Sequence, residues 1–447
     1  MIRTIFILVF TTLALFVSSL EAKAQMTLHD CMEYAVSQST KMRIQEAASD
    51  DARLERRAKI LELFTPEVKA DANAYYTFGR GIDPQTNTYI NTTTFYNNYS
   101  ADASIYLFNG FQAVNNYKIS RTGVLIAGSE AKKAEADVCL AVMEAYYNVA
   151  YYKRLVEVQQ EQVLAAEEAV VKARRQEDLG QKGHADVVQM EAELADRQYD
   201  LIKTANEYEK QKLTLSDLMF WSGEEELEIV TDPALLAGTP DLIGGEPVDA
   251  VVDHALAFNP NVQIADWKAR NAKLELNTAK WKLLPTLSLS AGWNTSYYTY
   301  PGMETMPFRE MFNLNSGEYV SLYIRIPIWN RMSQQTAVAK KRNAFNKASA
   351  ELDQTRRDVE TEVRKAIQDR DGSAAAWLQA QRKAEVQTEA YHLNLKKLDQ
   401  GLISPLEFQT ANNNYLKALA DEMDSQFKYL IKQAVVKYYS GIAYLDQ

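Results

Sequence analysis

The sequence predicts a mainly helical protein that also carries a small membrane β part, on the basis of three observations. Helix-breaking residues are scarce, because the 447 residues include only 17 Gly and 11 Pro. These are about 4% and 2% of the chain, against the usual roughly 7% and 5%. Two tracts of nearly seventy residues, 111–179 and 332–400, contain no proline. Four shorter segments alternate apolar and polar residues, which is the period of a β-strand.

An apolar run near the N-terminus indicates export. Arg3 is followed by an apolar stretch through Val17, and a small-residue A-x-A pattern ends at Ala24. This arrangement is typical of a cleaved secretory signal peptide, which we expect over residues 1–24. The formal charge of −10 and the mean hydropathy of −0.34 argue against a general nucleic-acid binder and against a bundle of membrane-spanning helices.

The chain is internally duplicated, because landmarks of the first half recur 219–221 residues later in the same order. The paired landmarks are Leu28–Ala35 with Val248–Ala255, Pro66 with Pro285, Asn109 with Asn330, and Gly180 with Gly401. Repetition at a fixed offset is the signature of a duplicated structural unit. We therefore expect a first repeat over 25–230, a linker over 231–247 and a second repeat over 248–447.

Each repeat contributes two predicted strands to a membrane sheet. We expect strands at about 67–78, 99–108, 286–299 and 318–328, with long polar loops over 79–98 and 300–317. Apolar residues occupy one face of each strand, and polar residues occupy the other. The candidates for a polar, lumen-facing side include Lys69, Asp71, Asp102 and Arg325. This alternation is typical of outer-membrane barrels, although a soluble four-stranded sheet would show it too.

Four strands cannot close a barrel, and lipid does not tolerate the open edges of a sheet. If these strands span a membrane, several chains must share one barrel. Two, three or four copies would give about eight, twelve or sixteen strands, and the alternation does not select among them.

The proline-free tracts 111–179 and 332–400 predict very long coiled-coil helices of roughly 100 Å each. Each tract breaks near a glycine, at 180 and at 401, and the chain then returns along a second helix. Behind the second break, Pro405 fits the first helical position after a Ser404 cap. The return helices are expected at about 186–220 and 406–439. Shorter helices over 42–63 and 262–284 would extend them to the length of the long ones.

This ordered set of features resembles the TolC-type outer-membrane efflux factors over essentially the whole mature chain. The duplication carries the resemblance, together with the strand ends 107–110 and 327–330 and the hairpin ends 178–187 and 399–408. The resemblance implies a homotrimer in the cell outer membrane, with a 12-stranded β-barrel, an α-helical periplasmic tunnel and residues 231–247 as an equatorial linker. Such a channel passively exports substrates from an inner-membrane pump (RND, ABC or MFS type) through a periplasmic adaptor, the membrane fusion protein.

The resemblance also assigns roles at the hairpin ends. Asp186 and Glu407 match inward-facing acids at the periplasmic mouth, although acids at a helix start also suit the helix dipole. The expected adaptor-docking ends comprise Leu179, Gly180, Gly183, Gly401, Leu402 and Ser404. Family positions for a tyrosine, an arginine and a further aspartate carry Leu398, Ile403 and Thr410 here. The family's closing network is therefore incomplete.

Two other classes of protein fit the sequence less well than an efflux channel. A periplasmic coiled-coil adaptor or scaffold would normally carry one hairpin, whereas this chain has two repeats with membrane-type strands. An outer-membrane enzyme would need a catalytic motif, and the chain has no GxSxG, HExxH or phosphate-binding glycine loop. The histidines at 29, 184, 254 and 392 lack metal-ligand spacing, so we expect no catalytic residue, metal or cofactor. Cys31 and Cys139 are expected to be buried small residues, with a disulfide as the alternative.

Overall fold

The computed structural model describes residues 24–82, 86–222, 227–230, 247–299 and 304–447. The predicted signal peptide, apart from Ala24, and the predicted linker, apart from Pro247, lie outside these residues. The chain forms two compact units. The hairpin unit comprises Met1–Ala47, Ser129–Gln263 and Thr355–Gln447, and the sheet unit comprises Ala48–Gly128 and Ile264–Gln354. Each unit draws on both sequence repeats, so the repeats are not themselves the compact units.

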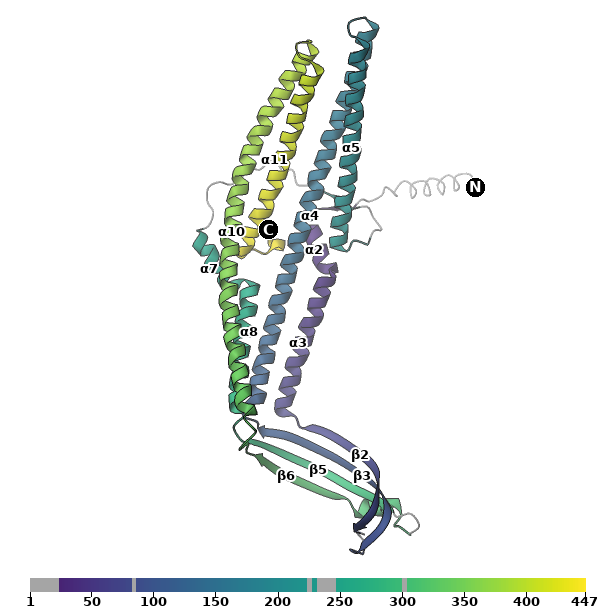
Figure 1. Cartoon of the computed structure of the whole chain (residues 1–447), viewed down its shortest axis with the longest axis vertical. Coiled ribbons are helices and arrows are strands. Elements are labelled where there is room, and N and C mark those ends of the chain that lie inside the picture. Colours follow the sequence, from purple (N-terminus) through teal and green to yellow (C-terminus); the bar gives the residue numbers. More distant parts are fainter. Residues whose placement is uncertain (1–23, 83–85, 223–226, 231–246, 300–303) are drawn as a thin grey trace, which may run out of the picture. The chain divides into compact units, whose positions relative to one another are not determined.

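The sheet unit is built on four antiparallel strands in the order β2-β3-β5-β6 (Figure 1). Their bounds are Glu67–Ile82 for β2, Tyr89–Phe108 for β3, Thr286–Thr299 for β5 and Gly317–Arg325 for β6. The central pair, β3 and β5, joins the second strand of the first repeat to the first strand of the second repeat.

The first hairpin of the sheet is longer than the sequence predicts. β3 begins at Tyr89 rather than at residue 99, and β2 continues to Ile82, so most of the expected loop 79–98 is strand. The Asn- and Thr-rich stretch extends because each of its residues pairs with one on β2, for example Thr94 with Thr77. The expected loop 300–317 likewise contains a helix, α9 (Phe308–Leu314). β6 ends three residues early, at Arg325.

A glycine in β5 makes room for a side-chain contact across three strands. Asp102 of β3, Gly292 of β5 and Tyr319 of β6 form one cross-strand row. The Tyr319 hydroxyl donates a hydrogen bond to Asp102 Oδ1. A Cβ atom at Gly292 would lie 2.3 Å from that oxygen and 2.7 Å from the Tyr319 ring. The tyrosine therefore lies over the glycine, and only a residue without a side chain fits beneath it.

Both strand-to-helix turns use left-handed backbone. Gly110 and Phe111 have φ of +65° and 60°, and the corresponding Arg331 and Met332 have 57° and 63°. A Cβ at Gly110 would lie 2.5 Å from the Trp281 carbonyl oxygen. The first turn thus requires glycine for close approach as well as for φ.

Two helices of the sheet unit are joined by polar side chains. Here α4 (Gln112–Asp178) packs against α8 (Pro260–Trp281). Asn115 Nδ2 donates a 2.8 Å hydrogen bond to Thr278 Oγ1, and Thr122 bonds Asn271 seven residues further along α4. The remaining long helices that enter this unit are α3 (Thr40–Phe64), which has no buried residue, and α10 (Ser333–Asp399).

The hairpin unit has the main hydrophobic core. Its other elements are α2 (Leu28–Gln38), α5 (His184–Met219), α7 (Val248–Phe258), α11 (Pro405–Tyr439), the 3-10 turn η1 (Tyr444–Asp446) and the paired strands β1 (Ala24–Met26) and β4 (Leu227–Ile229). Cys31 and Cys139 are free thiols in this core, 0% and 1% exposed. Burial raises the pKa of each thiol to about 12, so both stay protonated. Among the helices that the structure describes, none is both long and apolar enough to cross a membrane.

The two long hairpins, α4 with α5 and α10 with α11 (Figure 1), are tied together by a buried polar network. Arg197 of α5, whose side chain is 6% exposed, binds Glu193 at 2.7 Å and donates to Asn413 Oδ1 of α11 at 3.0 Å. Asn412 Nδ2 donates to Gln162 Oε1 of α4 at 2.8 Å. Gln162 also bonds Tyr391 of α10, whose pKa is raised by burial and lowered in part by Gln162 and Arg197.

We expect Gly292→Ala to destabilise the sheet by about 1–3 kcal/mol, the usual cost of overpacking. The added methyl group would displace the Tyr319 ring and break its hydrogen bond to Asp102. Thermal unfolding followed by circular dichroism measures the loss. Gly81→Ala in β2 is the matched control, because nothing lies within 4 Å of the Cβ position there. Equal melting temperatures for the two variants would contradict the account of Gly292.

We expect Arg197→Met to cost about 3 kcal/mol, because it leaves the mostly buried Glu193 carboxylate without its cation. Arg174→Met is the control, since the Arg174–Glu191 pair joins α4 to α5 in the same hairpin with side chains 64% and 41% exposed. Such a surface pair contributes under about 1 kcal/mol. Urea unfolding of the helical signal measures both. The interpretation fails if Arg174→Met destabilises the protein as much as Arg197→Met.

Candidate functional site

The four residues predicted to line a lumen share one face of the sheet. Lys69 of β2 pairs directly with Asp102 of β3, and Asp71 pairs with Ser100 two residues away. Arg325 lies six residues beyond Tyr319 on β6, which shares a row with Asp102. Because alternate residues of a strand point to the same face, Lys69, Asp71, Asp102 and Arg325 form one polar surface.

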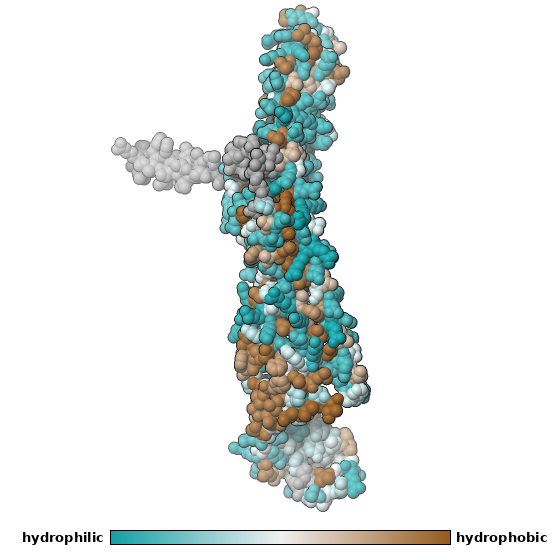
Figure 2. Space-filling view, turned by 90° about the vertical axis from the view of Figure 1, so that its left-hand side faces the viewer, coloured by the Kyte–Doolittle hydropathy of each residue, from teal (hydrophilic) through white to brown (hydrophobic). Residues whose placement is uncertain are grey.

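The opposite face of the sheet is apolar and uncovered over much of its area. Its large exposed side chains include Val68, Val320, Leu322 and Ile324, which are 59–77% exposed. Beyond the strand ends, Ile328 and Trp329 are 93% and 72% exposed. Figure 2 shows apolar side chains gathered at the helix ends that adjoin the sheet. A contiguous apolar surface of this kind is typical of a site that contacts protein or lipid.

The two hairpin ends have the same backbone geometry. Gly180 and Gly401 have φ of +68° and +69°, so both adopt the left-handed conformation that glycine favours. Each glycine N–H donates a hydrogen bond to the end of the preceding helix. Gly180 donates to the Glu177 carbonyl oxygen at 2.8 Å, and Gly401 donates to the Leu398 carbonyl oxygen at 3.0 Å. No atom lies within 4 Å of a Cβ at either glycine, so φ alone favours glycine there. Leu179 and Leu402 are exposed beside these turns.

Asp186 and Glu407 both stabilise a helix start. Asp186 Oδ2 accepts from the Gly183 N–H at 3.3 Å, and Glu407 Oε2 accepts from the Ser404 N–H at 2.8 Å. The Glu407 N–H in turn donates to the Ser404 hydroxyl oxygen at 3.2 Å, which completes a capping box. The helix-start role weighed in the sequence analysis is thus present, and a role at a mouth would require further copies of the chain.

The positions that depart from the family pattern make no polar contact between the hairpins among the described residues. Leu398 and Ile403 carry apolar side chains, and the Thr410 hydroxyl bonds the Leu406 carbonyl oxygen of its own helix. The contacts that join the hairpins instead lie further from their ends, at Arg197 and at Asn412. Sequence analysis missed these residues. The signal that could have revealed them is a polar residue within an apolar helical seam, such as Gln162 beside Val163.

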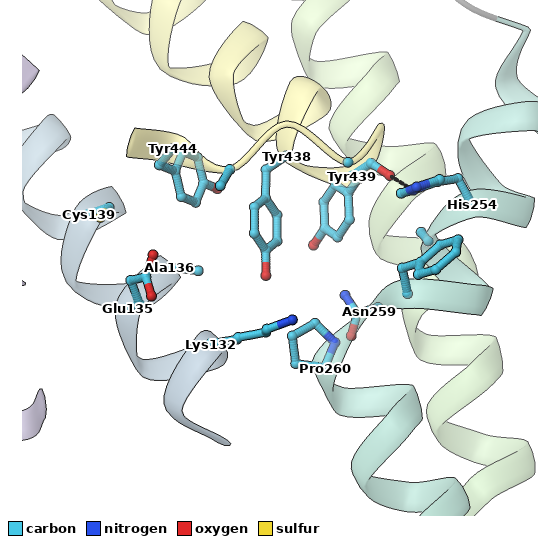
Figure 3. A pocket seen from close by; sticks show the side chains of 14 residues that line it. Lys132, Glu135, Ala136, Cys139, His254, Asn259, Pro260, Tyr438, Tyr439 and Tyr444 are labelled. Atoms are coloured by element: carbon cyan, nitrogen blue, oxygen red, sulfur yellow. Dashed lines mark hydrogen bonds between the residues drawn. The ribbon is translucent and has the colours of Figure 1, made fainter. Parts of the chain in front are cut away.

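A cavity of about 360 Å³ in the hairpin unit gathers several polar side chains. Figure 3 shows Tyr438, Tyr439, Lys132 and Asn259 around it. Burial raises the pKa of Tyr438 and, to about 12, that of Tyr439, so both hydroxyls remain protonated. His254 Nδ1 lies 3.1 Å from the Tyr439 carbonyl oxygen, to which it donates (Figure 3). The histidine thus stabilises the C-terminal end of α11 through this hydrogen bond.

Comparison with known proteins matches both the sequence and the fold. Residues 251–441 match the outer membrane efflux protein family. Outer membrane efflux protein BepC of Brucella suis is 22% identical over 304 residues. That alignment covers 68% of this chain and 60% of BepC, so the chain spans less than two thirds of this curated relative.

Solved structures match nearly the whole fold. CusC, which changes conformation as it folds and forms a transmembrane channel, superimposes with a TM-score of 0.76 and 14% identity. The match covers 94% of this chain and 93% of CusC. The outer membrane protein VceC of Vibrio cholerae has a TM-score of 0.73 and 14% identity, covering 93% of this chain and 96% of VceC. Residues 251–441 therefore match the outer membrane efflux protein family, and the chain as a whole has the fold of CusC and VceC.

Proposed function

We propose that the chain is the outer-membrane channel of a tripartite efflux or type I secretion system. Three copies form one duct, which passively exports substrates that an inner-membrane pump delivers through a periplasmic adaptor. The observation that carries the proposal is the four-stranded sheet, with one polar face, one apolar face and two unpaired edges. In lipid, such edges must be paired, and pairing them between copies encloses the polar face as a lumen.

The internal duplication supports the way in which the barrel closes. Within the chain, β3 of the first repeat pairs with β5 of the second. The second strand of one repeat thus pairs with the first strand of the following repeat. If β6 pairs in the same way, its partner is β2 of the next copy. Strand directions alternate from β2 to β6, so this pairing would be antiparallel and would continue the sheet without a break. Three copies then give the twelve strands that the TolC-type architecture requires.

The helices support the same arrangement between copies. Within the chain, α8 packs on α4 through the Thr122–Asn271 bond. The helix that corresponds to α8 in the first repeat is α3, which has no buried residue and exposes Leu54 and Leu61. The repeat offset places Asp51 at the position of Asn271, and Asn343 of α10 at the position of Thr122. We therefore expect α3 of one copy to pack on α10 of the next.

Oxidative cross-linking tests this assembly. A double variant, Asp51→Cys with Asn343→Cys, is expected to give covalent oligomers that end at three chains on a non-reducing gel. Native Cys31 and Cys139 are buried and should not contribute.

Arg53→Cys with Asn343→Cys is the control, because residue 53 lies about 200° around α3 from residue 51. Equal yields of oligomer from both pairs would contradict the proposed helix contact. Oligomers larger than three chains would contradict the trimer.

The hairpin ends would then serve as the periplasmic mouth and the adaptor-docking surface. Threefold symmetry turns Asp186 and Glu407 into six carboxylates, which would favour the entry of cations. The neighbouring turns present exposed Leu179 and Leu402, together with Gly180, Gly183, Gly401 and Ser404, to a partner. Apolar side chains on an exposed turn suit docking of another periplasmic coiled coil.

Planar-bilayer recordings test both the duct and its mouth. The protein is expected to form discrete channels whose reversal potential under a salt gradient indicates cation preference. Asp186→Asn with Glu407→Gln should reduce this preference, most strongly at low salt, where screening is weakest.

Glu168→Gln with Glu385→Gln removes the same charge from exposed positions away from the hairpin ends and should have a smaller effect. A double variant with the wild-type reversal potential would leave only the helix-start role for Asp186 and Glu407. A protein that neither inserts into the bilayer nor conducts would favour the alternative, a periplasmic coiled-coil adaptor or scaffold.

A further inference from the structure

The short helix α9 lies against the apolar face of the sheet. Phe312 contacts Trp293 of β5 and Tyr99 of β3, each with ring centroids 5.5 Å apart. Phe308 contacts Tyr297 with centroids 5.1 Å apart. By the strand register, Tyr99, Trp293 and Tyr297 share the face of Val320 and Leu322, opposite to Asp102 and Lys69. These aromatic contacts lie on what would be the outside of a closed barrel, whereas Met311 packs with Tyr298, which the register places on the polar face.

Hydrogen bonds hold α9 in this position. The Thr295 hydroxyl donates to the Phe312 carbonyl oxygen at 2.6 Å, and Asn315 Nδ2 donates to the Ser296 carbonyl oxygen at 2.8 Å. Met311 is 2% exposed beneath the helix. By contrast, Phe308 remains 45% exposed beside its contact with Tyr297, Leu314 is 69% exposed, and Arg309 is exposed as well. The helix is thus docked on the sheet and presents a mixed apolar and cationic surface outward.

The position of α9 coincides with the end of the uninterrupted apolar surface on β6. Trp293 pairs with Glu318, which lies on the same face as Val320, Leu322 and Ile324. A carboxylate within the hydrocarbon layer is costly, and the cost falls toward the interface. Glu318 and α9 therefore mark the same level, where lipid acyl chains give way to headgroups.

We propose that α9 is an interfacial helix, embedded in the lipid headgroup layer at the end of the barrel farthest from the long helices. Phe308 and Leu314 enter the boundary with the acyl chains, and Arg309 binds lipid phosphate, as amphipathic interfacial helices do. This inference rests on the membrane insertion proposed above. Beyond the last β5–β6 pair, Asn294 with Gly317, α9 lies along the edge of β5, where Met311 Sδ accepts from the Tyr298 N–H and Asn315 Nδ2 donates to the Ser296 carbonyl oxygen.

Depth-dependent fluorescence quenching tests the placement in reconstituted full-length protein. An environment-sensitive fluorophore is attached at Leu314→Cys, at Ile324→Cys on the apolar face, or at Lys182→Cys on a hairpin end. The buried native cysteines should take up no label, which unmodified protein verifies. Vesicles contain anionic phospholipid and carry nitroxides either at the headgroup or deep in the acyl chain.

At Leu314 we expect headgroup nitroxide to quench more than deep nitroxide, with the reverse at Ile324 and neither at Lys182. Arg309→Glu should reduce headgroup quenching at Leu314, whereas Glu310→Gln should not. If Leu314 behaves like Lys182 while Ile324 remains deeply quenched, the interfacial helix is overturned and the membrane barrel stands. Absence of lipid quenching at Ile324 would overturn both. An unchanged signal in Arg309→Glu would overturn the phosphate contact.

Discussion

The unpaired edges of the four-stranded sheet set the constraint on which the proposed assembly depends. Among the described residues of one chain, β2 and β6 have no partner strands on their outer sides. In water these edges could be solvated, but in hydrocarbon each unpaired N–H and C=O group costs several kcal/mol. The proposed channel would place the apolar face of the strands in that environment. In that proposal a single copy is an incomplete membrane structure, and its lumen forms only when the edges are paired.

Duplication gives a simple solution, because a contact made within the chain can be repeated between chains. α8 packs against α4 within the chain, whereas α3, the corresponding helix of the first repeat, has no buried residue. The repeats need not keep the same residues to keep the same backbone, since both strand-to-helix turns are left-handed. The first uses Gly110 under a close carbonyl oxygen, and the second accommodates Arg331.

The contacts between the two hairpins lie away from their ends. Arg197, Asn412 and Gln162 are buried, and a buried polar group is stabilising only while its hydrogen bonds are made. Separation of the hairpins would break the Arg197–Asn413 and Gln162–Asn412 bonds together. The turns themselves are stabilised locally, by glycine backbone and by the caps at Asp186 and Glu407. The local caps and the contacts between the hairpins therefore lie at different levels of the same helices.

Local patterns in the sequence determined the helices, the positions of the hairpin turns and the faces of the strands. The left-handed glycines at 180 and 401 and the Ser404 cap follow from a few neighbouring residues. Lys69, Asp71, Asp102 and Arg325 could be assigned to one face because strand period alone fixes the side to which each residue points. The resemblance supplied the roles of the hairpin ends, and the strand pattern supplied the candidate lumen.

Tertiary structure decided the features that depend on residues far apart in the chain. β3 extends to Tyr89 because its residues pair with residues of β2. The Asn and Thr residues of this stretch do not by themselves specify a strand, and the hydrogen bonds to β2 make it one. Tyr319 bonds Asp102, which lies 217 residues earlier in the sequence. No local signal shows that Gly292 is the residue over which the tyrosine side chain lies. The docking of α9 and the Arg197 network are equally non-local. Each depends on which surfaces the folded backbone brings together. Sequence periodicity does not show which residues far apart in the chain become neighbours.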